Sequence, residues 1–353
     1  MQVRKSWLIL FGFGVAVVVP ATMQARTSDL CGSCHTMHNS QDGVPVFGSQ
    51  GSAQPALLNN TCYGCHTGVN NGTTPYVLQL NGTPSYGETG TGGGANTLAG
   101  GNFHWVTMGD DATGHNVDGI VAGQLSRTPP GGNTVFDASS PLTCAGVNGC
   151  HGDRSVANTI YSIYQTHHSD PSLPIDGSSV AQSYRYLDGI VGIEDADWEY
   201  QSTGGTDHNQ YKGVDRASDT DADADTISHL CAQCHGLFHS GSGPDGVSDG
   251  TFGVDPWIRH PVDYDMNGLG GEFSAYGGAG VNAYNIATPV ASSNMSSGVK
   301  SIVLQSSGDA IVMCLSCHRA HGSPYPAMLR WNYQAWPGVG GYNGCGDCHT
   351  AKN

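Results

Sequence analysis

Short apolar runs alternate with long stretches rich in Gly, Ser, Asn and Asp, and stretches such as 87–101 and 240–253 indicate loops. Two runs, 76–80 and 302–304, have the pattern of short strands, whereas 156–165 has the pattern of one helical segment. A large conventional core built from long helices does not follow from this pattern. We therefore expect a mostly irregular fold with short helices and few short strands.

An apolar run over 7–19 follows two basic residues and leads into small residues. This order is typical of a secretory signal peptide over 1–25, with cleavage near Ala21 or Ala25. The run is too short to span a bilayer, although a retained N-terminal anchor is the alternative. No later stretch is long and apolar enough to cross a membrane. We expect an exported protein whose residues 26–353 form a single domain.

Five strict copies of Cys-x-x-Cys-His and one stretched copy recur along the chain. The strict copies begin at Cys31, Cys62, Cys231, Cys314 and Cys345, and the stretched copy runs from Cys144 to Cys150-His151. This is the attachment signature of c-type haem, in which two cysteines bond the porphyrin and the next histidine ligates the iron. A zinc knuckle, a redox dithiol or a disulfide is the alternative. None of these requires a histidine directly after the second cysteine.

The chain has 12 Cys, and six attachment pairs use all of them. We therefore predict six haem c groups; at the stretched motif the alternatives are a haem held by Cys150 alone or no haem. The predicted attachment cysteines are Cys31, Cys34, Cys62, Cys65, Cys144, Cys150, Cys231, Cys234, Cys314, Cys317, Cys345 and Cys348. The predicted proximal iron ligands are His35, His66, His151, His235, His318 and His349.

Composition fits a chain wrapped around cofactors. Charged residues make up 12% against about a quarter in ordinary domains, and there are 52 Gly. We expect the haems to supply the apolar interior of one continuous haem-threaded domain. The net charge of −16 argues against nucleic acid as a partner, because no basic stripe is present to neutralise phosphates.

The spacers between successive motifs contain 26, 77, 79, 78 and 26 residues. The three long spacers show no self-similarity that would indicate a repeat. The alternating Asp219, Asp221, Asp223 and Asp225 could bind calcium, but they lack the glycine and the glutamate of an EF-hand loop. We favour a solvated acidic loop.

Ten histidines remain after the six proximal ones: His38, His104, His115, His167, His168, His208, His229, His239, His260 and His321. So many spare imidazoles favour bis-histidine, low-potential haems over methionine ligation. His38 and His321 each lie three residues beyond a proximal histidine. Residues at i and i+3 share a helical face, so two such imidazoles cannot ligate one iron from opposite sides. Each would serve a different haem, and His38 could reach a neighbouring molecule.

Several patches resemble one family. They are Cys31-Gly-Ser-Cys-His-Thr-Met-His-Asn39, Cys314-Leu-Ser-Cys-His-Arg-Ala-His321, Gly101-Asn-Phe-His-Trp-Val106, Gly114-His-Asn116, Arg259-His-Pro261 and Cys348-His-Thr-Ala-Lys352. In this order, along most of the mature chain, they are similar to the OmcS-like family of filament-forming outer-surface hexahaem cytochromes. The resemblance implies a homopolymer with stacked bis-histidine haems, in which His38 ligates a haem of the adjacent subunit. It also implies His115, His260 and His321 as distal ligands.

The segment 184–211 resembles other multihaem cytochromes instead, in which His208 would be a ligand, with the pair His167 and His168 offering another. Two departures from the OmcS-like pattern bear on ligand pairing and polymerisation. The third motif is stretched and followed by Gly152-Asp-Arg154, which lacks a second histidine, and the last spacer is shorter. The expected distal set is His38, His115, His168, His208, His260 and His321, with His167 and His239 as further candidates.

We interpret the sequence as an exported cytochrome that transfers electrons through six haems, as an extracellular or cell-surface filament. Its partners would be copies of itself, other redox proteins and extracellular electron acceptors. A monomeric periplasmic or surface shuttle is the alternative. A multihaem reductase is disfavoured, because it needs an iron with an open sixth position and the surplus histidines favour closed sites.

Overall fold

The computed structural model describes residues 30–46, 55–86, 96–121, 127–132, 134–170, 172–216, 223–239, 260, 262–276, 282–335 and 342–351. The expected signal peptide, the predicted loop 240–253 and most of the predicted loop 87–101 lie outside these residues.

Helices in the described chain are short. The α-helices are α1 (Cys31–Cys34), α2 (Cys62–Cys65), α3 (His104–Thr107), α4 (Thr159–Ser162), α5 (Ile227–Ala232), α6 (Gly236–His239), α7 (Cys314–Cys317) and α8 (Cys345–Cys348). The 3₁₀ turns are η1 (Pro55–Leu57), η2 (Asp111–Thr113), η3 (Thr166–His168), η4 (Val180–Gln182), η5 (Tyr184–Tyr186), η6 (Gly271–Ala275), η7 (Met295–Ser297), η8 (Pro326–Met328) and η9 (Tyr333–Ala335). Single turns of this kind depend on tertiary contacts, because an isolated helix shorter than about 12 residues is marginal in water.

In the part of the chain that the structure describes, the strands form three antiparallel two-residue pairs. These are β1 (Ser40–Gln41) with β2 (Val44–Pro45), β3 (Gly192–Ile193) with β4 (Gln210–Tyr211), and β5 (Tyr264–Asp265) with β6 (Ile311–Val312). The predicted strands at 76–80 and 302–304 are wrong, because Leu78 and Ile302 each form only an isolated bridge. The expectation of a mostly irregular chain with short helices and few strands is confirmed.

The helix predicted over 156–165 is shorter than expected. Asn158 caps α4 by accepting hydrogen bonds from the backbone N–H groups of Ile160 and Tyr161, which fixes the start at Thr159. Gln165 adopts a left-handed backbone with φ of 65°, which ends the helical path and begins η3. The reversal orients His167 and His168 on a separate turn.

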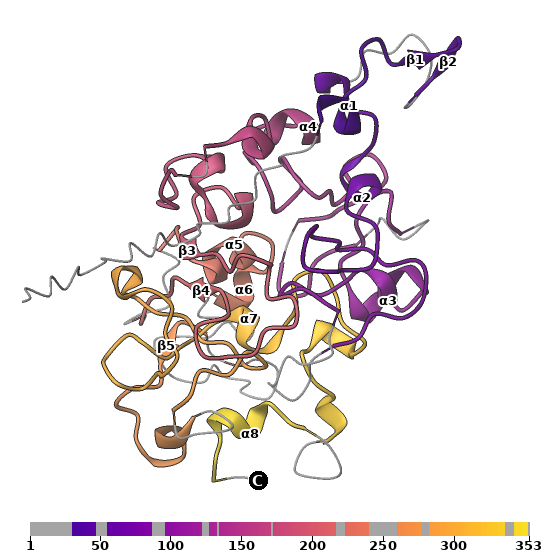
Figure 1. Ribbon diagram of the computed structural model, residues 1–353. Helices are drawn as coiled ribbons and strands as arrows, with labels where there is room; N and C mark the ends of the chain where they lie inside the picture. Colours follow the sequence, from indigo (N-terminus) through magenta and orange to yellow (C-terminus); the bar gives the residue numbers. More distant parts are fainter. Residues whose placement is uncertain are drawn as a thin grey trace, which may run out of the picture.

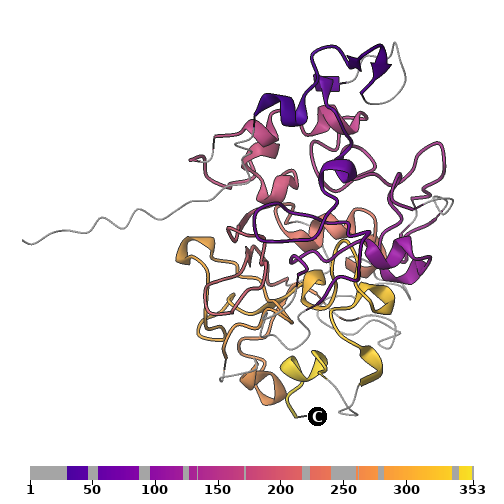
Figure 2. The ribbon, with the colours of Figure 1, turned by 45° about the vertical axis from the view of Figure 1, so that its right-hand side comes forward.

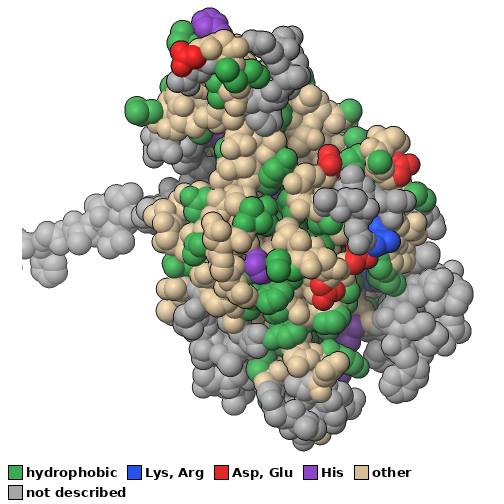
Figure 3. Space-filling view, turned by 90° about the vertical axis from the view of Figure 1, so that its right-hand side faces the viewer, with side chains coloured by type: hydrophobic (Ala, Val, Ile, Leu, Met, Phe, Trp, Pro, Cys, Tyr) green, Lys and Arg blue, Asp and Glu red, His purple; other side chains and the backbone are tan. Residues whose placement is uncertain are grey.

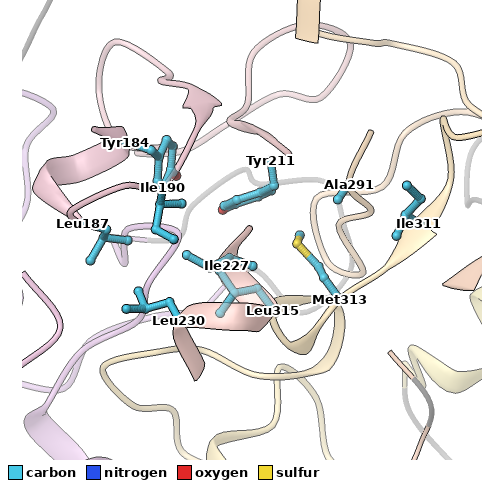
Figure 4. Packing of buried hydrophobic residues seen from close by; sticks show 10 residues of the cluster. All are labelled: Tyr184, Leu187, Ile190, Tyr211, Ile227, Leu230, Ala291, Ile311, Met313 and Leu315. Carbon is cyan, nitrogen blue, oxygen red and sulfur yellow. The ribbon is translucent and has the colours of Figure 1, made fainter. Parts of the chain in front are cut away.

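Three small apolar clusters replace a single core. The largest joins α5, α7 and the strands β4 and β6, and Figure 4 shows its ten side chains: Tyr184, Leu187, Ile190, Tyr211, Ile227, Leu230, Ala291, Ile311, Met313 and Leu315. A second cluster includes Tyr276 and Tyr284 and packs against Cys348. The third includes Phe103 and Val106 and packs against Cys144. Each cluster therefore lies against at least one attachment motif.

The attachment helices follow one another along the long dimension of the molecule. In Figures 1 and 2, α1 lies at the top, α2 below it, α5 and α7 in the middle, and α8 at the bottom near the C-terminus. The β1–β2 hairpin stands out beyond α1 as an N-terminal arm. The arm places large apolar side chains in solvent, with Met37 82% exposed and Val44 62% exposed.

Across the described part of the chain, every helix is too short and too polar to span a bilayer. Figure 3 shows a face on which uncharged polar and apolar side chains predominate and few charged side chains are visible. This surface fits the low charged content of the sequence.

Candidate haem-binding centres

The strict motifs share one local geometry. In each, the backbone N–H of the histidine donates to the carbonyl of the first cysteine, at 2.8 to 3.1 Å. Four of them place the Cys-x-x-Cys segment in a four-residue helix, α1, α2, α7 or α8, and the fourth motif begins within α5. One tight turn therefore presents two thiols and one imidazole from the same short segment.

The stretched motif reaches the same closure by a different path. The N–H of His151 donates to the carbonyl of Cys144 at 3.0 Å, although these residues are seven apart rather than four. The extra residues fold into a turn closed by bonds from Gly149 N–H to the Gly146 carbonyl at 2.8 Å and from Gly146 N–H to the His151 carbonyl at 3.0 Å. Gly146 has φ of +88°, and a Cβ there would lie 2.7 Å from the Val156 carbonyl oxygen, so glycine suits this position.

Five of the six proximal imidazoles are oriented by a contact of Nδ1 with a backbone carbonyl. In these five, Nδ1 lies 2.7 to 2.9 Å from a backbone carbonyl oxygen: His35 from Ala56, His66 from Pro75, His151 from Arg185, His235 from Pro130 and His318 from Ala327. In the sixth, His349 Nδ1 lies 3.2 Å from a Glu272 carboxylate oxygen. A carbonyl can only accept, so Nδ1 carries the proton and Nε2 keeps its lone pair for a metal.

Three of these carbonyls lie in separate turns of the same unusual kind. Ala56, Arg185 and Ala327 have φ of 57°, 49° and 58°, and the residue after each is also left-handed. Two consecutive left-handed residues tilt successive carbonyls toward the motif. The second carbonyl accepts from the N–H of the residue that follows the proximal histidine, at 2.7 to 2.9 Å. Sequence reasoning missed these turns.

The first and last spacers, 36–61 and 319–344, share a local structure. Pro-Ala-Leu-Leu at 55–58 and Pro-Ala-Met-Leu at 326–329 make the same turn and the same antiparallel bridge, from Leu58 to His35 and from Leu329 to His318. The following N–H then donates to the second cysteine of the motif, at 2.9 Å in both cases. Equal length and the shared Pro-Ala are the signals in the sequence that link these two end spacers.

Five proximal imidazoles each face a second imidazole. The ring centroids are 6.0 Å apart for His35 and His168, 6.3 Å for His66 and His167, 6.3 Å for His151 and His321, 6.2 Å for His235 and His115, and 6.0 Å for His349 and His260. The partners come from distant parts of the chain, so tertiary folding makes these pairs.

A centroid separation near 6 Å has the right size for a metal between two imidazoles, and it recurs at five of the six motifs. On each side of the metal, a metal–imidazole bond of about 2 Å and a ring radius of about 1 Å add up to about 3 Å. The two sides together give a centroid separation of roughly 6 Å. By contrast, His208 and Tyr284 stack directly at 3.5 Å between centroids. The five pairs therefore fit one six-coordinate iron each, and the adjacent thiols fit covalent haem.

Burial favours the neutral form of several imidazoles at these centres. Desolvation lowers the pKa of His167 to about 4 and that of His321 to about 3, and neighbouring histidines add to the effect. Desolvation also lowers the pKa of His115, His151 and His318. A neutral imidazole offers the lone pair that a metal requires.

His208 lies in a different environment from the one expected. It is fully buried, its Nδ1 is 2.7 Å from the Asn209 carbonyl oxygen, and its Nε2 is 3.1 Å from that of Lys300. Both nitrogens are thus directed at backbone carbonyls and the ring stacks on Tyr284. This geometry disagrees with the prediction that His208 is a distal ligand.

The remaining histidines are placed as follows. His104 is buried with Nδ1 2.7 Å from the Gln79 carbonyl oxygen and packs edge-on against Trp105. His229 lies in α5, and the His239 side chain lies outside the described residues. His38 is exposed on the N-terminal arm. Among the described residues, no imidazole faces His318 as a ring partner.

Neighbouring motifs touch through their thiols. The Cys144 thiol hydrogen-bonds with that of Cys62, which lowers the pKa of Cys62 to about 7. Cys231 and Cys314 form a second such pair, and the bond lowers the pKa of Cys314. The second motif therefore lies beside the third, and the fourth beside the fifth.

The structure gives no support to a zinc or calcium site in the part of the chain that it describes. There, no group of three His, Cys, Asp or Glu side chains comes together. Within the acidic stretch, Asp225 forms an ion pair with Lys212. Asp219 and Asp221 lie outside the described residues.

Comparison with known proteins agrees with the motif geometry. A family model for the doubled CXXCH motif matches residues 307–353. The C-type cytochrome OmcS of Geobacter sulfurreducens is 24% identical over 363 residues, which cover 86% of this chain and 78% of OmcS. Two solved structures are also similar, the Outer Membrane Cytochrome S filament and the OmcS nanowires of the same organism. They share 19% and 22% identity, cover 88% and 86% of this chain and 85% and 84% of theirs, and give TM-scores of 0.48 and 0.46. Together with the attachment motifs, this similarity over most of its length makes the chain similar to the C-type cytochrome OmcS.

Proposed function

We propose that the protein transfers electrons outside the cytoplasm through six covalently attached bis-histidine haems, as the subunit of a homopolymeric filament. Haem c, when bound, supplies a one-electron iron couple at each centre. The chain's own residues hold the cofactor, orient the axial imidazoles and exclude water. Electron transfer of this kind needs no substrate pocket, and we expect no substrate turnover.

The set of five imidazole pairs at 6.0 to 6.3 Å carries the proposal. We assign His168, His167, His321, His115 and His260 as the distal ligands opposite His35, His66, His151, His235 and His349. His167 takes the place that we had expected for His208. All 12 cysteines are assigned to thioether bonds, including Cys144, whose carbonyl closes on His151 as in the strict motifs.

The sixth centre supports assembly. His318 has no ring partner among the described residues, while His38 is exposed at the position equivalent to His321 in the repeated module. His321 serves a haem other than that of its own motif, because it faces His151. By the same logic His38 would serve another haem, and we assign it to the His318 centre of the adjacent subunit. The apolar side chains of the arm, led by Met37, would be covered in the same contact.

Shared elements would keep the haems close. The consecutive His167 and His168 would ligate the second and first irons, so one short turn ties two centres together. Thiol contacts join the second motif to the third and the fourth to the fifth. This spacing supports transfer along the chain, from one subunit to the next and onward to redox proteins or extracellular acceptors. The expected signal peptide supports export to the cell surface.

The first test measures haem content and spin state in the secreted holoprotein. Pyridine haemochrome absorbance and intact mass should give six thioether-bound haems per chain. Electron paramagnetic resonance of the assembled protein should show low-spin ferric iron, and dissociation into subunits should convert one haem to another spin or ligand state. Fewer haems, or several high-spin irons in the assembled protein, would contradict the proposal and favour an enzyme with open sites.

A further inference from the structure

Two buried cations lie beside the fifth motif. Arg330 is 2% exposed, and its Nε donates to the carbonyl of Leu315, inside the Cys-x-x-Cys turn, at 2.6 Å. Arg319 follows the proximal His318 directly and is 6% exposed, with Nη1 within 3.3 Å of the carbonyl oxygens of Leu98 and Ala99. Both guanidinium groups therefore lie within or against the protein that surrounds this centre.

Neither cation forms an ion pair in the described chain, although Arg319 lies 5.4 Å from the ring centroid of Tyr86 and Arg330 Nη1 donates to the Ile286 carbonyl at 3.3 Å. In the described chain, no carboxylate oxygen lies within 4.0 Å, the limit for an ion pair, of a guanidinium nitrogen of Arg330 or Arg319. Arg330 Nη2 and Arg319 Nε are buried and have no hydrogen-bond partner. Glu199 is close enough for the charge of Arg330 to oppose the rise that burial causes in the Glu199 pKa, but the two do not pair. A buried charge without an ion pair is costly, and here carbonyl oxygens accept from both guanidinium groups inside the protein.

The equivalent module at the N-terminus lacks both charges. Thr36 occupies the position of Arg319, directly after the proximal histidine, and Asn59 occupies that of Arg330, directly after the Pro-Ala turn. The Asn59 side chain makes the same kind of contact, since its Nδ2 donates to the Ser33 carbonyl of the first motif at 2.8 Å. The two modules thus share a backbone and differ in charge where the side chains meet the motif.

We infer that Arg330 and Arg319 raise the reduction potential of the haem at His318 above that of the haem at His35. The inference rests on the proposed function, since it requires haem at both centres. A buried positive charge in a low-dielectric site favours the iron that has gained an electron, and the effect is large because water does not screen it. Electrons would then reside preferentially on the C-terminal module, which gives each subunit an internal polarity.

The test is a potentiometric titration of the secreted holoprotein, followed by haem absorbance. Arg330→Gln and Arg319→Gln should each move one component of the titration, with the absorbance change of a single haem, to lower potential. Arg330→Lys keeps the charge, so this component should stay near its original potential. Asn59→Arg should shift a different component to higher potential. Arg127→Gln is the control, because Arg127 is exposed and pairs with Asp111 at 2.8 Å.

Superimposable titrations of Arg330→Gln, Asn59→Arg and the unmodified protein, all with full haem content, would overturn the inference. If Arg330→Gln fails to mature, Arg319→Gln decides the question, because it removes the other buried charge and leaves Arg330 in place. Failure of the proposed function is distinguishable, since it would appear in the unmodified protein as missing haems or open irons before any variant is compared.

Discussion

His151 donates its backbone N–H to the carbonyl of Cys144 at 3.0 Å, across seven residues, and so reproduces the bond that closes the strict motifs across four. The turn between them removes the extra length without moving the first cysteine away from the histidine. The stretched motif therefore presents its groups as a strict motif does.

Cys144→Ser should remove one thioether bond and keep the haem, because Cys150 still bonds the porphyrin. The unreacted vinyl group stays conjugated with the ring, so a share of the pyridine haemochrome α band should move to longer wavelength at unchanged haem mass. Cys31→Ser is the matched control in a strict motif and should give the same displacement. An unshifted band in Cys144→Ser alone would mean that Cys144 is not bonded.

His208→Phe should leave the haem spectrum unchanged and reduce stability. The phenyl ring can stack on Tyr284, but the one carbonyl, of Asn209 or Lys300, that accepts the single N–H of the neutral imidazole loses its buried donor, which costs about 1–3 kcal/mol. Denaturant unfolding measures the loss. His168→Ala is the contrasting variant and should lose one low-spin iron. Loss of a low-spin signal in His208→Phe would restore His208 as a ligand.

Ala327→Gly should stabilise the protein by about 1 kcal/mol, because Ala327 has φ of 58° and glycine adopts that backbone without a Cβ penalty. Ala327→Val should destabilise it, since a β-branched residue fits this region poorly. Thermal unfolding compares the two. A more stable valine variant would show that the left-handed turn is not the functional geometry.

Asp197 gives a pH dependence with a definite sign. Burial, together with a hydrogen bond to Asp195 and its charge, raises the Asp197 pKa to about 7, above the unfolded value of about 3.9. The folded state therefore holds a proton that the unfolded state releases, and stability declines as the pH rises from about 4 to about 7. Asp197→Asn should remove this part of the decline in unfolding midpoints. Asp42→Asn, at an exposed position, is the control and should retain it.

The sequence carried the attachment chemistry but not the pairing. Cys-x-x-Cys-His is local, so each predicted proximal histidine follows directly from its motif. Which distal imidazole faces which proximal one depends on loops that bring residues such as His115 and His235 together across the chain. The choice of His208 over His167 came from a sequence resemblance, and the structure gives the paired position to His167.

Backbone conformation was the other limit. Nothing in the residue type of Ala56 or Ala327 announces a left-handed turn, because alanine rarely adopts one without tertiary support. The helix expected over 156–165 contracted for a similar reason, since the Asn158 cap and the left-handed Gln165 overrode the apolar pattern. In a chain with such short helices and strands, hydrophobic periodicity predicts little of the secondary structure. The spacing of the Cys-x-x-Cys-His motifs still identifies the candidate haem-binding residues.

His38→Ala should retain full haem content and lose assembly. Removing the exposed imidazole takes the sixth ligand from the His318 centre of the neighbouring subunit, so one haem should change its spin or ligand state. Visible and electron paramagnetic resonance spectra report the iron, and sedimentation reports assembly. His104→Ala serves as a comparison, because His104 is buried beside Trp105 and is not assigned to an iron. Normal assembly of His38→Ala with all irons low-spin would contradict the intersubunit ligand.

Electron microscopy of the native secreted protein, without detergent, tests the central claim most directly. Uniform filaments with a regular axial repeat, and density joining His38 of one subunit to the His318 haem of the next, are the predicted result. Compact single particles with six closed haems would contradict polymerisation and leave a monomeric electron shuttle.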